Sequence, residues 1–533
     1  MSLQSIDFKD TGYFSSLMND YLDELESLKP FYNRFPKLEN FKDQIEEKES
    51  SFKTDHRTVL VDALKRQYKD VDASEKTLQN IEALAKAKTF TITTGHQLNL
   101  FTGPLYFLYK IVSAISLSEA LKAEHAGYNF VPIYWMASED HDFDEINFFN
   151  FKGKKIQWNR EASGAVGELS TDGLEAVFNI LSQEFGSSQN AETLKQLFKK
   201  AYLEHDDLAK ATMYLANQLF KEYGLVIVDA NDSELKRLFI PYVENELVEQ
   251  TSFNVVQNTS EALRSLSSSY KIQVNPREIN LFYLTENLRE RIIFEDNQFK
   301  VNNTRIVWSE SELLKEVNTY PERFSPNVIM RPLYQEVILP NLCYIGGGGE
   351  LAYWLQLKAF FDKVEVPFPM LLLRNSVLIQ TQQQQQKLQK LNISLKDIFL
   401  KRDGFINKKV REISNIDIDF SSQREHLEEQ FKAMYELAEQ TDKSFIGAVA
   451  SQEKKQIKGL NHLEKRLLKA QKKKLADEVS RMTELQNQLF PNGSLQERYN
   501  NFSELYLEYG NALIPKLMSS LNPLSGDFSI ITL

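Results

Sequence analysis

The stretch Thr89-Phe90-Thr91-Ile92-Thr93-Thr94-Gly95-His96-Gln97 decides the fold. Its β-branched and aromatic residues predict a buried strand over residues 89–94, because such side chains favour an extended chain. Gly95 and His96 end the strand, and Pro104 then opens an apolar-periodic segment that predicts a helix. Open parallel α/β sheets bind ligands at the carboxyl ends of their strands. The sequence therefore predicts an α/β fold with a ligand site that begins at Gly95 and His96.

A second strand with a polar end follows about forty residues later, a spacing typical of one strand-helix-strand unit. Residues 130–136, FVPIYWM, predict a buried strand, and residues 138–145, SEDHDFDE, bring five carboxylates and a histidine together directly after it. Because like charges repel, we expect a metal ion, a substrate ammonium or nearby Arg and Lys side chains beside them. A solvated first turn of a helix is the alternative explanation. The metal is unknown at this stage.

Two further segments supply candidate binding residues. In MRPLYQE (330–336), Arg331 is the first candidate for binding carboxylates, and Arg374 is the second. In GGGGE (346–350), consecutive glycines allow a ligand to approach the backbone closely, although a plain tight turn has the same composition. Glu350 in the first turn of a following helix would repel a phosphate. We therefore expect this loop to hold an amino group or a sugar hydroxyl.

Composition limits the possible classes. A chain of 533 residues predicts two or more domains, and a formal charge of −11 argues against binding to a nucleic-acid backbone. The single cysteine, Cys343, excludes an internal disulfide, fits a reducing compartment and lies in an apolar run typical of a packed core. No apolar run is long enough to cross a bilayer, and the N-terminus lacks a signal pattern. We expect a cytoplasmic protein without a membrane partner.

The organisation along the chain predicts one core and one protruding helical region. Residues 1–87 indicate helices, and two insertions are expected at about 148–222 and 240–322, within a core spanning 1–375. Apolar residues in a heptad pattern from Leu427 to Ala448, and again beyond Ile457, predict an antiparallel coiled coil over 376–490 that reverses near 447–456. Residues 491–533 are expected to return to the core. The coiled coil favours a homodimer.

Four stretches resemble one known family, namely TTGHQLNLFTGPLYFLYKI (93–111), PIYWMASEDHDFDEIN (132–147), MRPLYQEVILPNLCYIGGGGELAYWLQLK (330–358) and LFPNGSLQER (489–498). They are similar to the bacillithiol biosynthesis family BshC of cysteine ligases. The resemblance implies a Rossmann-like parallel-sheet core, related to class I aminoacyl-tRNA synthetases, with two connecting insertions and a long helical coiled coil. It implies a reaction that joins the carboxyl group of cysteine to the amine of glucosaminyl malate. Both compounds are then small-molecule partners, and no nucleic acid is expected.

ATP or ADP is the expected cofactor, since amide formation needs an activated carboxyl group. A synthetase has two histidines around a glycine at the position of TGHQ, whereas this chain has one, and we find no clear lysine-rich partner motif. A non-catalytic nucleotide-binding scaffold that acts through its coiled coil is therefore the alternative function. The candidate catalytic residues are His96, Asp140, His141 and Asp142. The candidate substrate-binding residues are Gly95, Gln97, Asn99, Ser138, Glu139, Arg331, Tyr334, Gln335, Gly347, Gly348 and Glu350, and the candidate cofactor-binding residues are Asn492, Gly493, Gln496 and Arg498.

Overall fold

A computed structural model describes residues 2–533, and the chain divides into two compact units. The first unit contains Tyr13–Leu378 and Gln496–Ile531 together with the residues before Asp10. The second contains Ile379–Leu495 with the short pieces Asp10–Gly12 and Thr532–Leu533. Among residues 2–533, no helix combines the length and the apolar character needed to cross a membrane.

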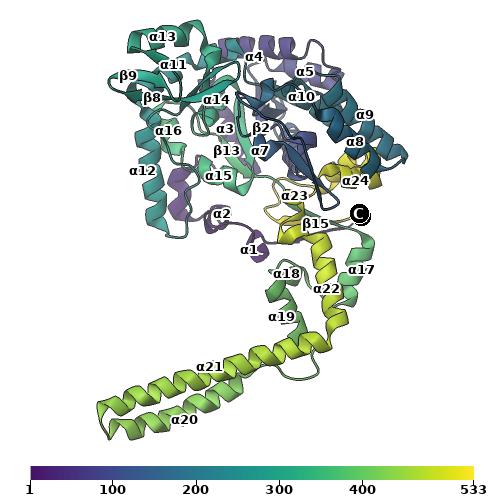
Figure 1. Ribbon diagram of the computed structural model, residues 1–533. Helices are drawn as coiled ribbons and strands as arrows, with labels where there is room; N and C mark the ends of the chain where they lie inside the picture. Colours follow the sequence, from purple (N-terminus) through teal and green to yellow (C-terminus); the bar gives the residue numbers. More distant parts are fainter. Residues whose placement is uncertain (1) are drawn as a thin grey trace. The chain divides into compact units, whose positions relative to one another are not determined.

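The first unit is built on a five-stranded parallel sheet in the order β13-β12-β2-β3-β6, which confirms the Rossmann-like α/β prediction (Figure 1). Its strands are β2 (Thr89–His96), β3 (Asn129–Met136), β6 (Val226–Asp229), β12 (Asn341–Gly346) and β13 (Met370–Leu373). The chain adds strands on one side of β2 and later returns to add β12 and β13 on the other side. The strand order therefore reverses between β2 and β12, where such sheets bind ligands.

The strand β2 is longer than the sequence predicted. It continues through Gly95 and His96, which pair with Trp135 and Met136 of β3. Strand β3 contains Pro132, which has no N–H group to donate to a neighbouring strand. The strand can still lie inside the sheet, because β6 pairs only with Ile133–Met136 and leaves Pro132 without a partner strand on that side. Helix α6 (Tyr106–Glu124) follows β2 and begins two residues after Pro104, so Pro104 precedes the helix instead of occupying its first position.

Other helices and the two insertions surround this sheet. The N-terminal elements are β1 (Ser2–Ile6), α1 (Phe8–Thr11), α2 (Ser16–Leu22), α3 (Phe41–Ser51), α4 (Thr54–Gln67) and α5 (Glu75–Ala83). The first insertion has α7 (Phe143–Ile146), the hairpin β4 (Phe148–Phe151) and β5 (Lys154–Gln157), and then α8 (Leu174–Phe185), α9 (Gln189–Leu203) and α10 (Leu208–Phe220). The first insertion is thus mainly helical. Cys343 is fully buried in the apolar core between sheet and helices.

The second insertion carries a small antiparallel sheet. Its elements are α11 (Ser233–Glu249), α12 (Thr251–Leu266), β7 (Leu281–Thr285), β8 (Leu288–Glu295), β9 (Gln298–Val301), β10 (Val307–Trp308), α13 (Glu310–Thr319) and β11 (Phe324–Pro326). Strands β7 and β8 pair antiparallel as a hairpin. The core resumes in α14 (Met330–Ile338), followed by α15 (Gly348–Trp354) and α16 (Lys358–Lys363). Asn327 Oδ1 accepts hydrogen bonds from the N–H groups of Ile329 and Met330 just before α14.

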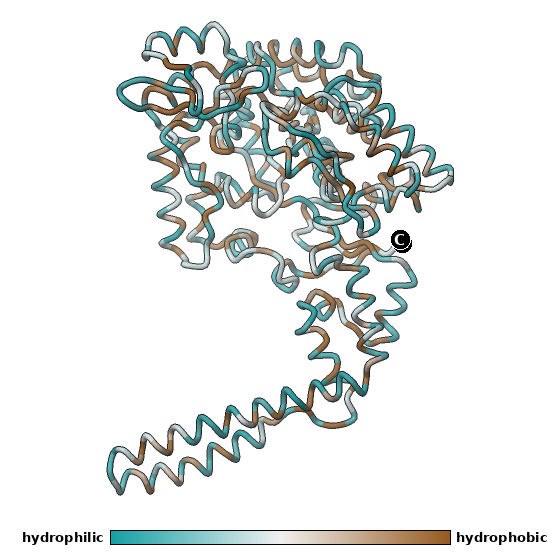
Figure 2. The backbone as a smooth tube through the Cα atoms, viewed as in Figure 1, coloured by the Kyte–Doolittle hydropathy of each residue, from teal (hydrophilic) through white to brown (hydrophobic). Residues whose placement is uncertain are grey.

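The second unit is helical and contains an antiparallel pair of long helices, in agreement with the predicted coiled coil (Figure 1). Its helices are α17 (Gln382–Lys390), α18 (Leu395–Ile398), α19 (Arg402–Ile413), α20 (Ser421–Glu439), α21 (Lys443–Lys474) and α22 (Ala476–Leu489). Figure 2 shows brown, apolar segments recurring between teal ones along both arms. The chain reverses after Glu439, not near 447–456, because Asp442 caps α21 through the N–H of Ser444. The heptad pattern does not locate this turn, because apolar residues recur at heptad spacing on both sides of it.

The C-terminal part of the chain contains α23 (Gln496–Tyr499), α24 (Phe502–Tyr509), α25 (Leu513–Ser520) and β15 (Phe528–Thr532). Strand β15 lies between β1 and β14 (Val377–Gln380) in a three-stranded sheet. Asn501, just before α24, donates hydrogen bonds to the carbonyls of Phe101 and Gly103 in the loop after β2. These two hydrogen bonds hold the loop that follows β2 in place.

Candidate active site

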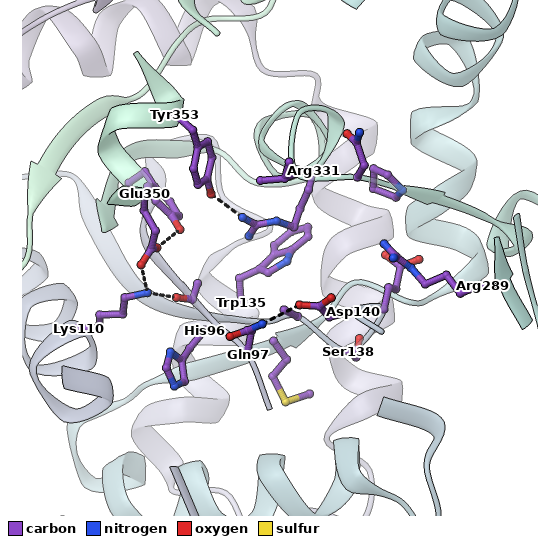
Figure 3. A pocket seen from close by; sticks show the side chains of 18 of the residues that line it. His96, Gln97, Lys110, Trp135, Ser138, Asp140, Arg289, Arg331, Glu350 and Tyr353 are labelled. Carbon is purple, nitrogen blue, oxygen red and sulfur yellow. Dashed lines mark hydrogen bonds and ion pairs between the residues drawn. The ribbon is translucent and has the colours of Figure 1, made fainter. Parts of the chain in front are cut away.

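A cavity of about 300 Å³ lies at the carboxyl edge of the central sheet, beside the point where the strand order reverses (Figure 3). We call it the central cavity. Loops and ends from β2, β3 and β12, the helices α6, α14 and α15, and the second insertion all contribute to it. Its lining residues are Gly95, His96, Gln97, Tyr106, Lys110, Trp135, Met136, Ala137, Ser138, Glu139, Asp140, Arg289, Pro326, Asn327, Val328, Arg331, Tyr344, Glu350 and Tyr353.

His96 is held as a neutral imidazole. Its ring packs against Tyr106 and Phe107 at the start of α6, and only 7% of the residue is exposed. Burial, helped by the charge of Lys110, lowers the pKa of His96 to about 3. The backbone of Thr102 hydrogen-bonds the ring, whereas the buried Nε2 atom has no partner. The Nε2 atom of His96 is therefore a buried hydrogen-bond acceptor that lacks a partner among residues 2–533.

Lys110, which is buried, and Glu350, whose side chain is 28% exposed, form an ion pair on one side of the cavity. The Nζ atom of Lys110 lies 2.5 Å from Oε1 of Glu350 and donates to the carbonyl of Gly95 at 2.6 Å. Burial alone would raise the pKa of Glu350, but the pairing with Lys110 outweighs it and holds the pKa below its usual value. Tyr344 OH donates to the other oxygen of Glu350 at 2.8 Å. Both charges of the pair are thus compensated within the protein.

The glycine turn before α15 does not fit a phosphate group. The N–H of Gly347 already donates to Oε1 of Glu350 at 3.3 Å, and the carboxylate caps the helix. An anion at this terminus would meet a negative charge in place of free N–H groups.

Asp140 is fixed as a carboxylate. Its Oδ2 accepts from Gln97 Nε2 at 3.0 Å, and its Oδ1 accepts from the N–H of His141 at 2.7 Å. Burial alone would raise the pKa of Asp140, but the hydrogen bonds from His141 and Gln97 outweigh it and hold the pKa well below the usual range. Such a carboxylate is a weak base at neutral pH. It can hold and orient a cationic group more readily than it can remove a proton.

Arg331 brings an uncompensated positive charge into the cavity. Its Nη2 donates to Tyr353 OH at 2.6 Å, and no carboxylate among residues 2–533 forms an ion pair with it. A Cβ atom on Gly95 would lie 3.3 Å from Nη1 of Arg331, so the glycine allows the guanidinium to approach the end of β2. Arg374, the second candidate, instead forms a buried ion pair with Glu497 at 2.8 Å. Only Arg331 of these two remains free to bind an anion.

The acidic loop after β3 has cationic partners within the protein. Glu139 pairs with the buried Lys236 of α11, and the guanidinium of Arg289 donates to His141 Nδ1 at 2.7 Å. Ser138 donates a short hydrogen bond to Asp229 at the end of β6. Within residues 2–533, no group of three or more His, Cys, Asp or Glu side chains is arranged to hold a metal ion. Lys236 thus neutralises Glu139, whereas Asp142, Asp144 and Glu145 form no ion pair among residues 2–533.

Several predicted residues lie outside the central cavity. His141 and Asp142 are exposed, and Asp142 precedes α7 without a side-chain capping bond. Asn99, Tyr334 and Gln335 are buried, where they bond to the carbonyl of Glu145, the carbonyl of Ala230 and Glu336, respectively. Gly347 and Gly348 start α15, Asn492 and Gly493 form the turn η7 (Pro491–Gly493), and Gln496 and Arg498 belong to α23. Their roles as substrate or nucleotide ligands stay predictions. Burial raises the pKa of Tyr106, and the nearby charge of Arg498 opposes that shift.

Sequence reasoning missed Lys110, Arg289, Tyr344 and Tyr353. Tyr353 had a local signal, because it lies three residues after Glu350 on the same helical face. Lys110 is the one charged residue in the otherwise apolar first turns of α6, which also marks it. Arg289 had no such signal. It lies in the second insertion, and only the folded hairpin β7–β8 carries it to the cavity.

The fold and the cavity together define a class, a Rossmann-like α/β protein with a desolvated polar ligand site at the strand-order reversal. A family model described as "Bacillithiol biosynthesis BshC, N-terminal Rossmann-like domain" matches residues 1–375. A second one, "Bacillithiol biosynthesis BshC, C-terminal coiled-coil domain", matches residues 377–533. The chain therefore belongs to the bacillithiol biosynthesis BshC family, as its sequence motifs indicated.

Curated relatives support this assignment over the full length. Proteins of Flavobacterium johnsoniae and Christiangramia forsetii are each 59% identical to the chain, with all of the chain and at least 99% of each relative aligned. A protein of Cytophaga hutchinsonii is 40% identical over 98% of the chain and 97% of its own length. All three have the curated name "Putative cysteine ligase BshC". The family is thus an enzyme family whose curated members are named as ligases.

Proposed function

We propose that this protein is the ligase that joins cysteine, through its carboxyl group, to the amine of glucosaminyl malate, with ATP as the activating co-substrate. The name shared by its relatives supports the class of reaction. The main structural support for the proposal is the set of side chains that line the central cavity. One small space brings together a free imidazole lone pair, a permanent carboxylate and an unpaired guanidinium, supplied by His96, Asp140 and Arg331.

These three groups complement the proposed acceptor. Glucosaminyl malate has two carboxylates and an amine that is protonated in part at neutral pH. Arg331 offers bidentate hydrogen bonds to a carboxylate, and Asp140 attracts the ammonium. His96 Nε2 accepts a hydrogen bond from a hydroxyl or from the amine. A ligand of this charge pattern satisfies every polar group that the cavity leaves without a partner.

The roles follow from the charge states. The ammonium loses its proton to water, and the free amine nitrogen then attacks the activated carboxyl carbon of cysteine. The C–N bond forms as the C–O bond to AMP or phosphate breaks, and the second proton on the nitrogen is also released to water. Asp140 positions the amine, because a carboxylate with so low a pKa stays ionised and holds the cation in place. The ion pair of Lys110 and Glu350 fixes the end of β2 through the carbonyl of Gly95. This pair therefore keeps the neighbouring His96 in place.

The decisive experiment measures formation of the amide by mass spectrometry from cysteine, ATP and glucosaminyl malate. Asp140→Asn and His96→Asn should lower kcat/KM by about 100-fold or more, since each removes a group that orients the reactants. Asp142→Asn is the matched control, because Asp142 is exposed and does not line the cavity. Loss of product in that variant would restore Asp142 to the site, as the sequence first suggested.

Two outcomes would overturn the proposal. If the wild-type protein forms no amide from cysteine, ATP and glucosaminyl malate, the ligase function is wrong and the scaffold function is favoured. If amide forms without consumption of ATP, the nucleotide part is wrong. Where ATP is consumed, accumulation of AMP indicates an adenylate and accumulation of ADP indicates an acyl phosphate.

A further inference from the structure

We propose that Arg289, on the hairpin β7–β8 of the second insertion, is a specificity-determining residue that binds the dicarboxylate end of the acceptor together with Arg331. The identity of that acceptor rests on the proposed function. The binding of a dicarboxylate does not, because it follows from two guanidinium groups that line the same cavity and that form no ion pair among residues 2–533.

Arg289 is held in position by contacts that leave its charge available. Its guanidinium carbon lies 3.9 Å from the centre of the Phe282 ring, and its Nη1 donates to His141 Nδ1 at 2.7 Å. Both partners are uncharged, since a histidine that accepts at Nδ1 is neutral. No carboxylate within residues 2–533 forms an ion pair with this guanidinium. The ring contact and the hydrogen bond hold the positively charged guanidinium of Arg289 at the wall of the cavity.

The other cations in and beneath the cavity are already neutralised. Lys110 pairs with Glu350, Lys236 pairs with Glu139, and Arg374 pairs with Glu497. Arg289 and Arg331 are the exceptions. A partly buried guanidinium without an anion costs free energy, and an anionic ligand removes that cost. Two such groups in one small cavity favour a ligand that carries two anionic groups.

The neighbouring carboxylate distinguishes a dicarboxylate from a polyphosphate. Burial lowers the pKa of Arg289, and the charges of Glu139 and Asp140 oppose that shift. The charges of Glu350 and Asp140 favour the charged form of Arg331 against burial. Figure 3 shows Asp140, Arg289 and Arg331 around the same pocket. A ligand between these groups needs anionic ends for the arginines and a cation for Asp140. An amine-bearing dicarboxylate satisfies all three, whereas a triphosphate brings only negative charge toward Asp140.

The first experiment uses L-malate and pyrophosphate alone as probes, measured by titration calorimetry on the full-length protein. L-Malate should bind the wild type, and Arg289→Gln and Arg331→Gln should each weaken that binding by about 30-fold or more. Arg289→Lys keeps the charge but not the fork of donors and should lose less, about 10-fold. Arg291→Gln is the matched control, because Arg291 lies two residues further along β8 and does not line the cavity.

Equal L-malate binding by the wild type and by Arg289→Gln would overturn the proposal. Binding of pyrophosphate, but not of L-malate, that depends on Arg289 would overturn it as well and would assign the arginines to a phosphate. Circular dichroism shows whether each variant folds. If Arg289→Gln does not fold, Arg289→Lys serves for the same comparison.

The second experiment separates this inference from the proposed function. In the amide-forming assay, Arg289→Gln should raise KM for glucosaminyl malate by about 30-fold and leave KM for cysteine unchanged. The wild type should prefer glucosaminyl malate over a methyl glucosaminide, which lacks the carboxylates, and the variant should lose most of that preference. An unchanged preference refutes the role of Arg289 and leaves the ligase intact. Arg289-dependent binding of L-malate without any amide product refutes the ligase and leaves the dicarboxylate site intact.

Discussion

Two cavities lie at the same edge of the central sheet and share Met136 and Ser138, yet they differ in how they treat charge. The central cavity measures about 300 Å³, and the second, between α4, α10 and the end of β6, measures about 690 Å³. In the central cavity Lys110 is 3% exposed and pairs with Glu350. In the second, the Lys210 side chain is 65% exposed and pairs with Asp207. The smaller cavity thus removes its lysine from water and the larger one does not, although burial also affects Asp229 in the larger one.

This difference teaches that volume alone does not indicate a site of chemistry. Electrostatic interactions weaken strongly in water, so charges on the wall of an open cavity have little effect on a ligand. The groups of the central cavity are desolvated, and three of them, at His96, Arg289 and Arg331, keep unused hydrogen-bonding or charge capacity. Desolvation with unused capacity distinguishes this cavity from its larger neighbour.

The largest expected effect compares the two lysines. Lys110→Met leaves Glu350, whose side chain is 28% exposed, without its cation, and we expect the free energy of unfolding to fall by about 3 kcal/mol. Lys210→Met removes a largely exposed pair and should change it by at most about 1 kcal/mol. Urea denaturation followed by circular dichroism measures both. Similar losses in the two variants would show that the cavities do not differ in desolvation, which would break the comparison.

The second expected effect is a difference in pH dependence. Because the pKa of His96 is about 3 in the folded protein, the unfolded chain takes up a proton there near pH 6.5 and the folded chain does not. Stability should therefore be complete above pH 6.5 and should fall by up to about 1.4 kcal/mol per pH unit as the pH decreases toward 3. His96→Asn should lose this slope in urea denaturation at pH 7, 6 and 5. An unchanged slope would mean that His96 is not desolvated.

Asp229, which lines the second cavity, supplies the opposite sign for the same experiment. Burial raises its pKa, so the folded protein takes up a proton before the unfolded chain does as the pH falls. This group adds stability as the pH falls through its raised pKa toward the ordinary value. Asp229→Asn should therefore make the loss of stability at low pH steeper, whereas His96→Asn should make it shallower. Slopes that change in the same direction would contradict the assignment.

The smallest expected effect concerns the wall between the two cavities. A Cβ atom on Gly167 would lie 2.7 Å from Cβ and 2.9 Å from the carbonyl oxygen of Ser138, so Gly167→Ala must displace the loop after β3. We expect a loss of about 1–3 kcal/mol in stability together with a lower rate of amide formation. Gly459→Ala is the control, since Gly459 has open space around it in α21 and gains up to about 1 kcal/mol of helix propensity. A neutral Gly167→Ala would show that the loop moves freely.

Local patterns predicted the strands and the polar ends that begin the site. The β-branched run of β2 and the apolar run of β3 are short-range signals, and Gly95, His96 and Asp140 follow from them directly. Asp140 and Asp142 were equivalent in sequence, and the fold separates them. The carbonyls of Asp140 and Ser138 accept hydrogen bonds from Val166 and Gly167 of the first insertion, which set the course of the loop. These hydrogen bonds join residues far apart in the chain, so the sequence around Asp140 does not predict them.

From its sequence alone, this protein was determined to be an α/β ligase-family member with a polar site at the end of β2 and a long helical hairpin, because strand, heptad and family motifs are encoded by neighbouring residues. Only the tertiary structure decided the strand order, the turn after Glu439 and the entry of Arg289 into the cavity. These features depend on contacts between residues far apart in the chain. The balance of buried charge that defines the site arises from such contacts and has no local signature.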